Sequence, residues 1–587
     1  MLKLLKYIKL REWLLFLLSL VFIFAQVFLD LKLPDYMSNI TKLVETAGSA
    51  ANDVWRAGGM MLLCSLGSLA ASITVTLLAS KIAAGFSRRL RGAMFNKVET
   101  FTLEEINAFS TASLITRSTN DVVQVQMLIV MSMQVLVKAP VMAVWAITKI
   151  AGKAWQWSLA TGIAVAVLTI LLVIVMKFTF PRFRKIQWLQ DALNHSAREN
   201  LNGVRVVRAY NAEDYQESKF EKANTDLMEN SLYVNRITTI MSPFMSLTMN
   251  CLSMSIYWIG AVLINSVAQS TPGAEELRVA IFADMIVFMS YATQVIMAFI
   301  MIILVIMIAP RALVAAGRIN EVLETEPRVL DGELTADTEE KGEIEFRNVC
   351  FTYPGGSGHA LEGINFCAHR GETVAFIGST GSGKTSLVNL VPRFYDATEG
   401  EVLVDGINVR EYALEELYKK ISYVPQTAVM FSGTVKSNVL FGSAAEEERL
   451  EKALRISMSR EFVDELEEKE DSDVAQRGTN FSGGQKQRLS IARALSRNAE
   501  ILIFDDTFSA LDYKTDRELR DALKAETRGV TKLIVAQRIG TIMGADRIIV
   551  LDEGRQVGMG THEELLETCE VYRQIALSQL SEEELAI

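Results

Sequence analysis

The chain has 587 residues, of which 50% are hydrophobic, and its formal net charge at pH 7 is -10. Proteins that bind a nucleic-acid backbone use clustered lysine and arginine to replace counterions, so this acidic balance argues against a nucleic-acid partner. The apolar residues crowd into about the first 310 positions, in runs of roughly 20 that can cross about 30 Å of hydrocarbon as helix. We therefore expect a membrane-embedded N-terminal half and a soluble C-terminal half.

Six apolar segments predict membrane helices. They span about residues 13–33, 57–80, 127–150, 157–180, 243–267 and 280–308. The first begins like a signal peptide, but its length and the spans that follow favour a retained membrane helix. Lysine and arginine gather before the first span and after the second and fourth, which predicts that the N-terminus and the C-terminal half are cytoplasmic.

Long polar stretches separate spans two and three, and again spans four and five, and both keep a helical pattern. Helices of this length extend well beyond a bilayer, at about 1.5 Å per residue. Within the spans themselves, Lys138 and Asp284 are ionisable, and a charge at membrane depth is costly unless it faces a cavity or an opposite charge. The sequence leaves open whether these two pair, face a pathway or mark a hydrated helix end.

The five cysteines form no recognisable pattern. They are far apart, without a CxxC pair, and stand at Cys64, Cys251, Cys350, Cys367 and Cys569. Such spacing suggests neither a disulfide framework nor a zinc site. We expect all five to be packing residues.

The composition changes after Pro310. We predict a membrane domain at residues 1–310, an acidic linker at 311–342 and a soluble α/β domain at 343–587. The segment GEIEFRNVCFTY alternates as a strand does, while ETVAFIG, EILIFDD and TKLIVAQ are short apolar runs typical of buried strands.

A glycine-rich loop follows the strand ETVAFIG. Its sequence, GSTGSGKT, fits the P-loop pattern, in which backbone N–H groups close around phosphate oxygens, the lysine reaches the β and γ phosphates, and the last hydroxyl binds Mg²⁺. The motif alone does not distinguish kinases, GTPases and transport ATPases. The candidate nucleotide-binding residues here are Gly378, Ser379, Thr380, Gly381, Ser382, Gly383, Lys384, Thr385 and Ser386, with Thr385 also on the metal.

A second anion-binding surface is predicted in NFSGGQKQRLSIARAL, where a serine and two glycines open a helix. This segment resembles the LSGGQ signature of the ATP-binding cassette (ABC) family, and the resemblance continues through ILIFDD, SALD and YVPQ. The six spans with long cytoplasmic helices are similar to those of the family's exporters. The resemblance implies an all-α six-helix transmembrane domain followed by an α/β P-loop nucleotide-binding domain, with ATP and Mg²⁺ as cofactors.

The resemblance also assigns roles by position. Tyr353 would stack on adenine, Gln426 would sense Mg²⁺ and the γ phosphate, and Asp505 would hold Mg²⁺ through water. In this family each ATP lies between one subunit's P-loop and the other subunit's signature. The residues that would complete a second subunit's site are Ser482, Gly483, Gly484, Gln485 and Asp512.

The catalytic centre departs from the family pattern at two positions. The residue after Asp505 is normally a glutamate that polarises the attacking water, and here it is Asp506, one methylene shorter. A general base must come within about 2.6–3.2 Å of its proton, so slow hydrolysis is expected. The second departure is Gln537, where the family has a histidine that contacts the γ phosphate, and a glutamine offers no titratable proton. The candidate catalytic residues are therefore Asp505, Asp506 and Gln537.

Two weakened positions beside an intact P-loop and signature predict a site that binds ATP and turns it over poorly. We expect a plasma-membrane heterodimer of two half-transporters, in which this chain completes the partner's competent site and helps to export hydrophobic or amphipathic compounds. A homodimer would have two weak sites. The alternatives are a non-hydrolysing regulatory or structural subunit and an exporter of a specific lipid or peptide.

Two cytoplasmic segments resemble the coupling loops of such exporters. The stretch Ser118 to Gln126 resembles the exit of the first loop, and a short helix near Tyr210 to Asp214 would dock on a nucleotide-binding domain. Closure of the cassettes around ATP would pull on these segments and turn an inward-open cavity outward.

Overall fold

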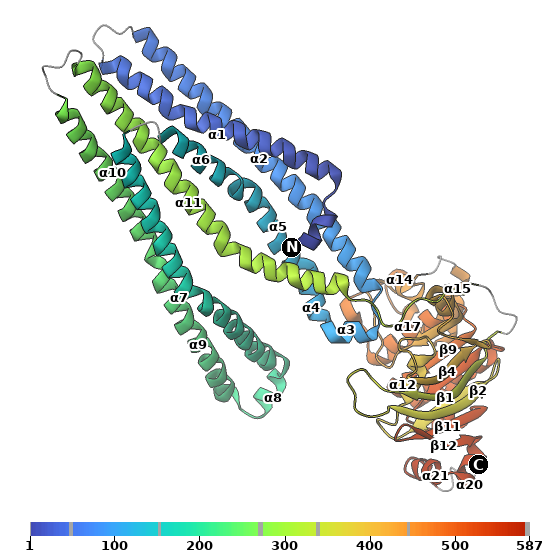
Figure 1. Ribbon diagram of the computed structural model, residues 1–587. Coiled ribbons are helices and arrows are strands. Elements are labelled where there is room, and N and C mark those ends of the chain that lie inside the picture. Colours follow the sequence, from blue (N-terminus) through green and yellow to red (C-terminus); the bar gives the residue numbers. More distant parts are fainter. Residues whose placement is uncertain are drawn as a thin grey trace. The chain divides into compact units, whose positions relative to one another are not determined.

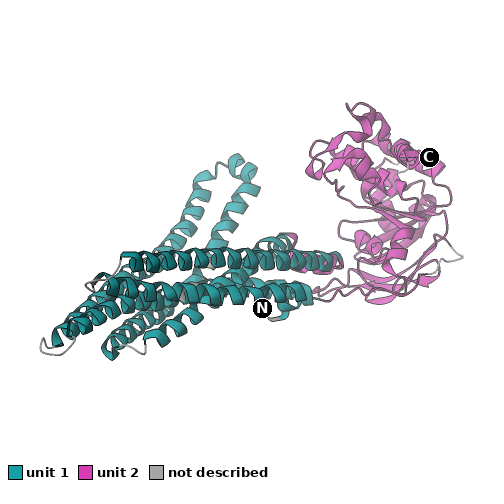
Figure 2. Ribbon diagram, turned by 90° about the horizontal axis from the view of Figure 1, so that it is seen from above, with its two compact units in different colours: residues 1–99, 112–325 teal, residues 100–111, 326–587 magenta. Residues whose placement is uncertain are grey.

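The computed structural model describes residues 2–45, 51–150, 154–267, 274–335, 341–442 and 447–581. The chain divides into two compact units (Figure 2). The first holds residues 1–99 and 112–325, and the second holds residues 100–111 and 326–587. A short segment of the membrane half, Thr100–Thr111, therefore folds with the C-terminal unit.

The regular elements of the first unit are all helices in its described residues (Figure 1). Its helices are η1 (Leu2–Tyr7), α1 (Leu10–Glu45), α2 (Ala51–Glu99), α4 (Thr111–Thr116), η2 (Arg117–Asp121), α5 (Val122–Met131), η3 (Ser132–Leu136), α6 (Lys138–Ile150), α7 (Trp155–Asn202), α8 (Val204–Ala209), α9 (Glu213–Thr239), α10 (Met241–Ser266) and α11 (Ala274–Glu324). Six helical stretches in the described part of the chain are long and apolar enough to cross a membrane. Each predicted span lies within one helix or continuous helical run, to within a residue.

The long helices extend as predicted. Helix α2 has 49 residues and α7 has 48, so each is about 70 Å long against about 30 Å of hydrocarbon. Helix α11 continues through Pro310 to Glu324, so almost four of its turns, residues 311–324, occupy positions expected in the linker. The reason is an apolar stripe at helical spacing beyond the proline, formed by the buried residues Ala312, Ala315, Ala316, Ile319 and Val322.

Two ion pairs join α1 to α6. The Lys138 ammonium is 3.3 Å from the Asp30 carboxylate of α1, an acidic residue that the sequence did not single out. Nearby along α1, Asp35 pairs with Lys149 at 2.9 Å and accepts a 2.7 Å hydrogen bond from the buried Tyr291 hydroxyl of α11. A charge pair inside a membrane domain avoids the cost of a lone charge, so these contacts join α1 to α6 and α11.

The second unit is built on a ten-stranded sheet with strand order β5-β4-β1-β2-β12-β11-β3-β10-β9-β6. The strands are β1 (Ile344–Phe351), β2 (Leu361–Ala368), β3 (Thr373–Gly378), β4 (Glu399–Val404), β5 (Ile407–Asn408), β6 (Ile421–Val424), β9 (Ile501–Asp505), β10 (Thr531–Val535), β11 (Arg547–Asp552) and β12 (Arg555–Gly560). Strands β11, β3, β10, β9 and β6 pair in parallel, while β2, β1, β4 and β5 pair antiparallel. A small ribbon of β7 (Gly433–Thr434) and β8 (Asp473–Val474) stands apart.

Helices cover the sheet and form a helical subdomain. They are α3 (Leu103–Phe109), α12 (Lys384–Leu390), α13 (Leu414–Lys420), α14 (Val435–Val439), α15 (Glu447–Ile456), α16 (Arg460–Asp464), α17 (Gly483–Ser496), α18 (Tyr513–Glu526), α19 (Ile539–Ile542), α20 (His562–Thr568) and α21 (Glu570–Leu577). The parallel strands are buried along almost their whole length, as the apolar runs predicted. A separate apolar cluster holds α14 to α17 together.

Candidate nucleotide-binding site

The candidate site lies where parallel strands end side by side. Strand β3 runs into Gly378, β9 ends at Asp505, and Gln426 and Gln537 follow the last residues of β6 and β10 by two positions. Because β9 lies between β6 and β10, and β10 pairs with β3, these residues meet at one edge of the sheet. The carboxyl ends of parallel strands are where open α/β sheets bind ligands.

The P-loop is tightly built at its glycines. Gly383 has φ +96°, and an added Cβ there would lie 2.6 Å from the Ala360 carbonyl oxygen, so only glycine fits. The Lys384 ammonium donates to the carbonyl oxygens of Gly378 at 2.8 Å and Ser379 at 2.7 Å. Burial lowers the pKa of this ammonium, against the opposing charges of the neighbouring carboxylates. The lysine therefore bonds to carbonyl oxygens of its own loop, and phosphate oxygens would replace them as acceptors.

Asp505 and Thr385, two predicted metal ligands, are already in contact. The Thr385 hydroxyl donates to Asp505 Oδ1 at 2.8 Å, and the Tyr423 hydroxyl lies 3.0 Å from Asp505 Oδ2. Burial raises the pKa of the Asp505 carboxyl, and the Asp506 charge adds to that rise, while the two hydrogen bonds act the other way. Hydroxyl and carboxylate oxygens are the ligands that Mg²⁺ prefers, so this pair fits the ion.

The two positions that depart from the family pattern contact each other. Gln537 Nε2 donates to Asp506 Oδ2 at 2.7 Å, and Gln426 Nε2 donates to the same oxygen at 3.1 Å. Asp506 is 6% exposed and has the left-handed conformation φ 47°, ψ 31°. A carboxylate oxygen has two lone pairs, so both acceptor positions of Oδ2 are filled. We call this group of three side chains the amide clamp.

Tyr353 stands beside the helix that follows the P-loop. Its hydroxyl is 2.8 Å from the Ser386 hydroxyl of α12, and its ring packs edge-on against Phe351 and Tyr395. The side chain is 37% exposed. The ring is therefore partly accessible, as stacking on a planar base requires.

The signature residues form a helix start. Ser482 caps α17, accepting from the Gln485 N–H, and the Gln485 side chain accepts from the Ser482 N–H in return. Gly483 and Gly484 are the first two residues of this 14-residue helix. Asp512 caps α18 by accepting from the Thr515 N–H at 3.0 Å. These groups hydrogen-bond locally at the N-termini of α17 and α18, and a helix N-terminus is a place where backbone N–H groups can bind an anion.

The sequence did not predict that α3 packs with the second unit. Glu105 Oε1 accepts a hydrogen bond from the Arg328 N–H at 3.1 Å, and Glu104 pairs with the Arg328 side chain at 3.0 Å. Asn107 of α3 hydrogen-bonds to Tyr395, the ring that packs on Tyr353. The signal in the sequence was the capping box formed by Thr102 and Glu105, which marks a separate helix after α2.

The two segments predicted to be coupling loops lie in the first unit. Residues 118–126 run through η2 and α5, and the short helix expected near Tyr210 to Asp214 is instead α8, which ends at Ala209. Tyr210 itself follows that helix and is 80% exposed. Tyr423, the hydroxyl beside Asp505, was also missed, although it belongs to the same SYVPQ segment that yielded Gln426.

Comparison with known proteins adds to this geometry. The model of the ABC transporter family matches residues 361–509, and the model of the ABC transporter transmembrane region matches residues 16–299. An uncharacterized ABC transporter ATP-binding protein of Mycobacterium tuberculosis is 40% identical over 89% of this chain and 87% of its own length. The ATP-dependent lipid A-core flippase of Pseudomonas fluorescens is 33% identical over 83% of this chain and 79% of its own length.

A solved structure of a bacterial Atm1-family ABC exporter with ATP bound superposes with a TM-score of 0.82 at 22% sequence identity. It covers 98% of this chain and 100% of the other, which confirms the predicted fold class. The six apolar helices and the matched transmembrane region make the chain a multi-pass membrane protein. The chain belongs to the ABC transporter family, as a half-transporter that joins a transmembrane region and an ATP-binding domain in one polypeptide.

Proposed function

We propose that this half-transporter works in a heterodimer in the plasma membrane, with residues 343–587 as its cytoplasmic nucleotide-binding domain. Its own site binds ATP and Mg²⁺ and hydrolyses slowly, and its signature completes a competent site on the partner. The P-loop residues would cradle the phosphates, Thr385, Asp505 and Gln426 would serve the metal, and Tyr353 would stack on adenine. Ser482 to Gln485 and Asp512 would face the partner's ATP.

The amide clamp is the observation that carries this proposal. Asp506 would be the residue that polarises water, yet Gln537 and Gln426 occupy both acceptor positions of its Oδ2. A water could reach this carboxylate only through Oδ1, on a side chain one methylene shorter than the family's glutamate. General-base catalysis contributes about 10²–10⁴-fold and depends on such reach, so the clamp favours binding over turnover.

Coupling to transport would begin at α3. Asn107 bonds to Tyr395, Tyr395 packs on Tyr353, and the Tyr353 hydroxyl meets Ser386 of the P-loop helix. An adenine stacked on Tyr353 would therefore contact a side chain that is connected, through Tyr395, to α3. The segments near Ser118 to Gln126 and Tyr210 to Asp214 remain candidate coupling elements of the same mechanism.

We propose hydrophobic or amphipathic compounds as substrates, with lipids favoured among them. Relatives at 31–33% identity are named as ATP-dependent lipid A-core flippases. In the first unit, an apolar groove of about 570 Å³ runs between α7 and α10, lined among others by Leu159, Ile163 and Leu247. A groove of this size and polarity suits an acyl chain or a similar hydrocarbon.

A purified pair tests the heterodimer. The chain alone and the chain co-purified with a second half-transporter are compared for phosphate release from ATP in detergent and in lipid. We expect a slow lone chain and a fast pair, and the pair should lose about 10²-fold or more when the partner's catalytic glutamate becomes glutamine. Asp506→Asn in this chain should leave the pair's rate nearly unchanged.

Two outcomes would decide against parts of the proposal. A lone chain that hydrolyses ATP as fast as any pair would establish a working homodimer and overturn the impaired site. Transport that persists in the pair carrying Lys384→Ala would instead favour a structural subunit whose own ATP site is dispensable.

A further inference from the structure

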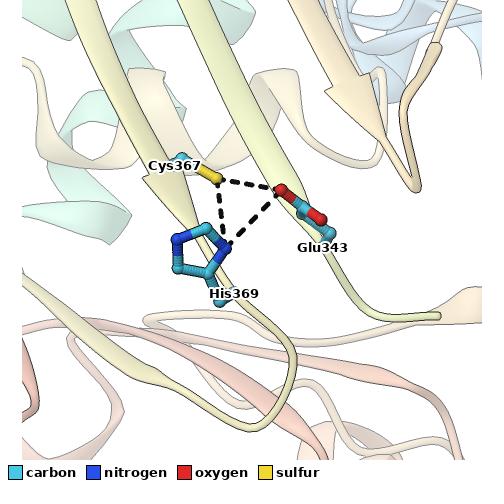
Figure 3. Close-up of side chains that lie close together, drawn as sticks. All are labelled: Glu343, Cys367 and His369. Atoms are coloured by element: carbon cyan, nitrogen blue, oxygen red, sulfur yellow. Dashed lines mark hydrogen bonds and ion pairs between the residues drawn. The ribbon is translucent and has the colours of Figure 1, made fainter. Parts of the chain in front are cut away.

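A glutamate, a cysteine and a histidine outside the candidate nucleotide site lie together at one end of the β1–β2 ladder (Figure 3). Strands β1 and β2 are antiparallel, with Glu345 opposite Cys367, so the register continues to place Glu343 opposite His369. Side chains two residues apart on a strand point to the same face. The pairing of two strands therefore brings together side chains that are 24 residues or more apart in sequence.

The three donor atoms form a triangle of the size that a tetrahedral metal needs. Cys367 Sγ is 3.1 Å from Glu343 Oε1 and 3.6 Å from His369 Nδ1, and Nδ1 is 3.6 Å from Oε1. Zinc binds sulfur at about 2.3 Å, nitrogen at about 2.0–2.1 Å and oxygen at about 2.0–2.2 Å, which gives tetrahedral edges of roughly 3.3–3.6 Å between ligands. A zinc ion fits with sub-ångström adjustment of the side chains.

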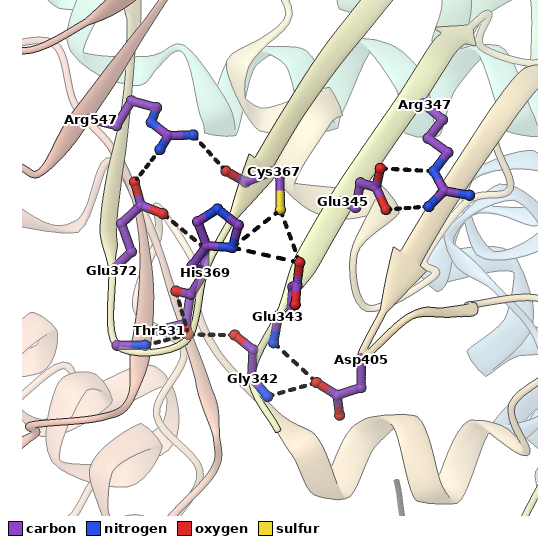
Figure 4. A network of polar contacts seen from close by, with 11 residues as sticks. Gly342, Glu343, Glu345, Arg347, Cys367, His369, Glu372, Asp405, Thr531 and Arg547 are labelled. Carbon is purple, nitrogen blue, oxygen red and sulfur yellow. Dashed lines mark hydrogen bonds and ion pairs between the residues drawn. The ribbon is translucent and has the colours of Figure 1, made fainter. Parts of the chain in front are cut away.

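The backbone that carries Glu343 is fixed by a buried carboxylate (Figure 4). Asp405 Oδ1 accepts hydrogen bonds from the N–H groups of Gly342 at 2.6 Å and Glu343 at 3.0 Å. Asp405 is itself held by Lys420, whose ammonium lies 2.7 Å from the other carboxylate oxygen. The glutamate therefore projects from a rigid strand start, although it follows directly on a linker.

The backbone that carries His369 is fixed as well. Glu372 Oε2 accepts from the His369 N–H at 2.8 Å, and Arg547 holds the same glutamate at 3.1 Å. The Thr531 hydroxyl accepts from the Gly371 N–H at 3.0 Å and donates to the Gly342 carbonyl oxygen. One side chain thus ties the histidine turn to the glutamate strand, and such supporting contacts are what orient metal ligands.

Arginine side chains pair with two of the neighbouring carboxylates, but the Glu343 carboxylate has other contacts. Arg347 binds Glu345 through two hydrogen bonds of 2.8 Å and 2.6 Å, and Arg547 pairs with Glu372. The Glu343 carboxylate instead contacts the Cys367 thiol and the His369 imidazole. Among the acidic side chains here, Glu343 is the one whose neighbours are themselves metal-binding groups.

We propose that Glu343 Oε1, Cys367 Sγ and His369 Nδ1 bind Zn²⁺, with water in the fourth position. Mixed sulfur, nitrogen and oxygen ligands in a tetrahedral arrangement favour zinc over Mg²⁺ or Ca²⁺, which take oxygen. The ion would clamp β1 to β2 immediately after the linker. Under this proposal Cys367 is a metal ligand, a role beyond the packing role that its sequence spacing suggested.

Without the ion, the thiol is a hydrogen-bond donor to Glu343. Burial, with the Glu343 hydrogen bond next in size, raises the pKa of the Cys367 thiol to about 12. Zinc binds the thiolate, so binding must displace that proton.

Cobalt substitution tests the site in the full-length protein, purified in detergent with any affinity tag removed and without nucleotide. We expect one Co²⁺ per chain, with the visible absorption of tetrahedral cobalt and a thiolate-to-cobalt charge-transfer band that Zn²⁺ abolishes. Cys367→Ser should remove the band. His369→Gln should weaken binding by more than the about 10–100-fold that loss of a supporting contact costs.

Matched controls are available because the chain has only four histidines and five cysteines. Cys350→Ser on β1 and His359→Gln should keep the cobalt spectrum. Cobalt bound by oxygen ligands at Thr385 and Asp505 would lack the charge-transfer band. A band that survives Cys367→Ser, or full-length protein that gives no band with Co²⁺, would overturn the proposal. If Cys367→Ser does not fold, His369→Gln, a change at an exposed side chain, decides the question.

Discussion

Asp506 and Gln537 are each conservative replacements when considered alone, and their effect comes from their contact. A glutamate at position 506 would carry its carboxylate over an ångström further, and a histidine at position 537 would present one N–H in place of an amide. As the residues stand, the amide of Gln537 lies 2.7 Å from Asp506 Oδ2. With Gln426 on the same oxygen, both acceptor positions of Oδ2 are filled, so this oxygen could activate water only if an amide moved away.

Restoring both family residues should raise the rate of this site. We expect Asp506→Glu with Gln537→His to increase ATP hydrolysis by the lone chain by about tenfold or more, because the base regains its reach and one clamp donor is removed. Steady-state phosphate release measures the change. Gln537→His alone serves as the comparison, since it opens the clamp without lengthening the base, and should give a smaller gain. An unchanged rate in the double variant would mean that the clamp does not limit turnover.

At the scale of single elements, α3 shows how a seven-residue helix is held in place. Its Glu105 is 5% exposed and accepts from both the Thr102 N–H and the Arg328 N–H, whereas its neighbour Glu104 pairs with an exposed arginine side chain. A buried acceptor that serves backbone donors matters more than a surface ion pair. The two adjacent glutamates therefore form a natural matched pair.

Glu105→Ala should loosen α3, at a cost of about 1–3 kcal/mol in local stability, because two backbone donors lose their acceptor. Hydrogen exchange of residues 100–111 should speed up accordingly. Glu104→Ala, the control, should cost about 0–1 kcal/mol and leave the exchange of this segment close to wild type. Equal effects of the two changes would contradict the role given to Glu105.

The C-terminal helices α20 and α21 should respond to acid through His562. Its Nδ1 lies 2.6 Å from the Tyr572 hydroxyl, and burial lowers the pKa of the imidazole, against a smaller opposing effect of Glu563. A lowered pKa means stability that is present above the unfolded value of about 6.5 and is lost as pH falls through the folded value. Protection factors of the amides in α20 and α21, which are corrected for the intrinsic pH dependence of exchange, should therefore fall below about pH 6.5.

Two histidine variants check this pH response. His562→Gln should flatten it, because glutamine does not titrate. His359→Gln should leave it intact. A pH response that survives in His562→Gln would assign it to another group.

The elements that the sequence predicted correctly, and the nucleotide site that it proposed, are encoded locally. The P-loop, the signature and the strand-end carboxylates follow from short segments, because each lies within one turn or strand end. The Glu343, Cys367 and His369 cluster did not, since it depends on the register of two antiparallel strands and no CxxC spacing announces it. The docking of α3 was missed for the same reason, because its partner Arg328 is 223 residues away.

At the scale of the whole molecule, charge pairs help to fix the membrane half. Asp30 is bonded by both the Lys138 ammonium and the Ser68 hydroxyl, so helices α1, α2 and α6 share one carboxylate. The Lys138 side chain is 18% exposed and the Asp30 side chain is 21% exposed. Removing one partner from such a pair leaves an uncompensated charge, while removing both costs less.

Lys138→Met should therefore lower the Tm of the detergent-purified protein by several degrees, and the double variant with Asp30→Asn should recover most of that loss. A thermal shift series measures both and yields the coupling between the residues. Lys3→Met, which removes the exposed pair with Glu324, should have little effect and serves as the control. Additive losses in the double variant would show that the pair does not stabilise the fold.

The placement of α3 also has a consequence for how the protein is made. Its docking contact, Arg328, is translated 223 residues after Glu105, which at about 5–20 residues per second is a delay of roughly 10–45 s. During that time the ribosome-bound chain holds its first loop without a docking surface, while the later spans are being inserted. Truncation before the soluble domain would make this state permanent. We expect proteases to cleave the undocked loop in membrane halves that lack the ATP-binding domain.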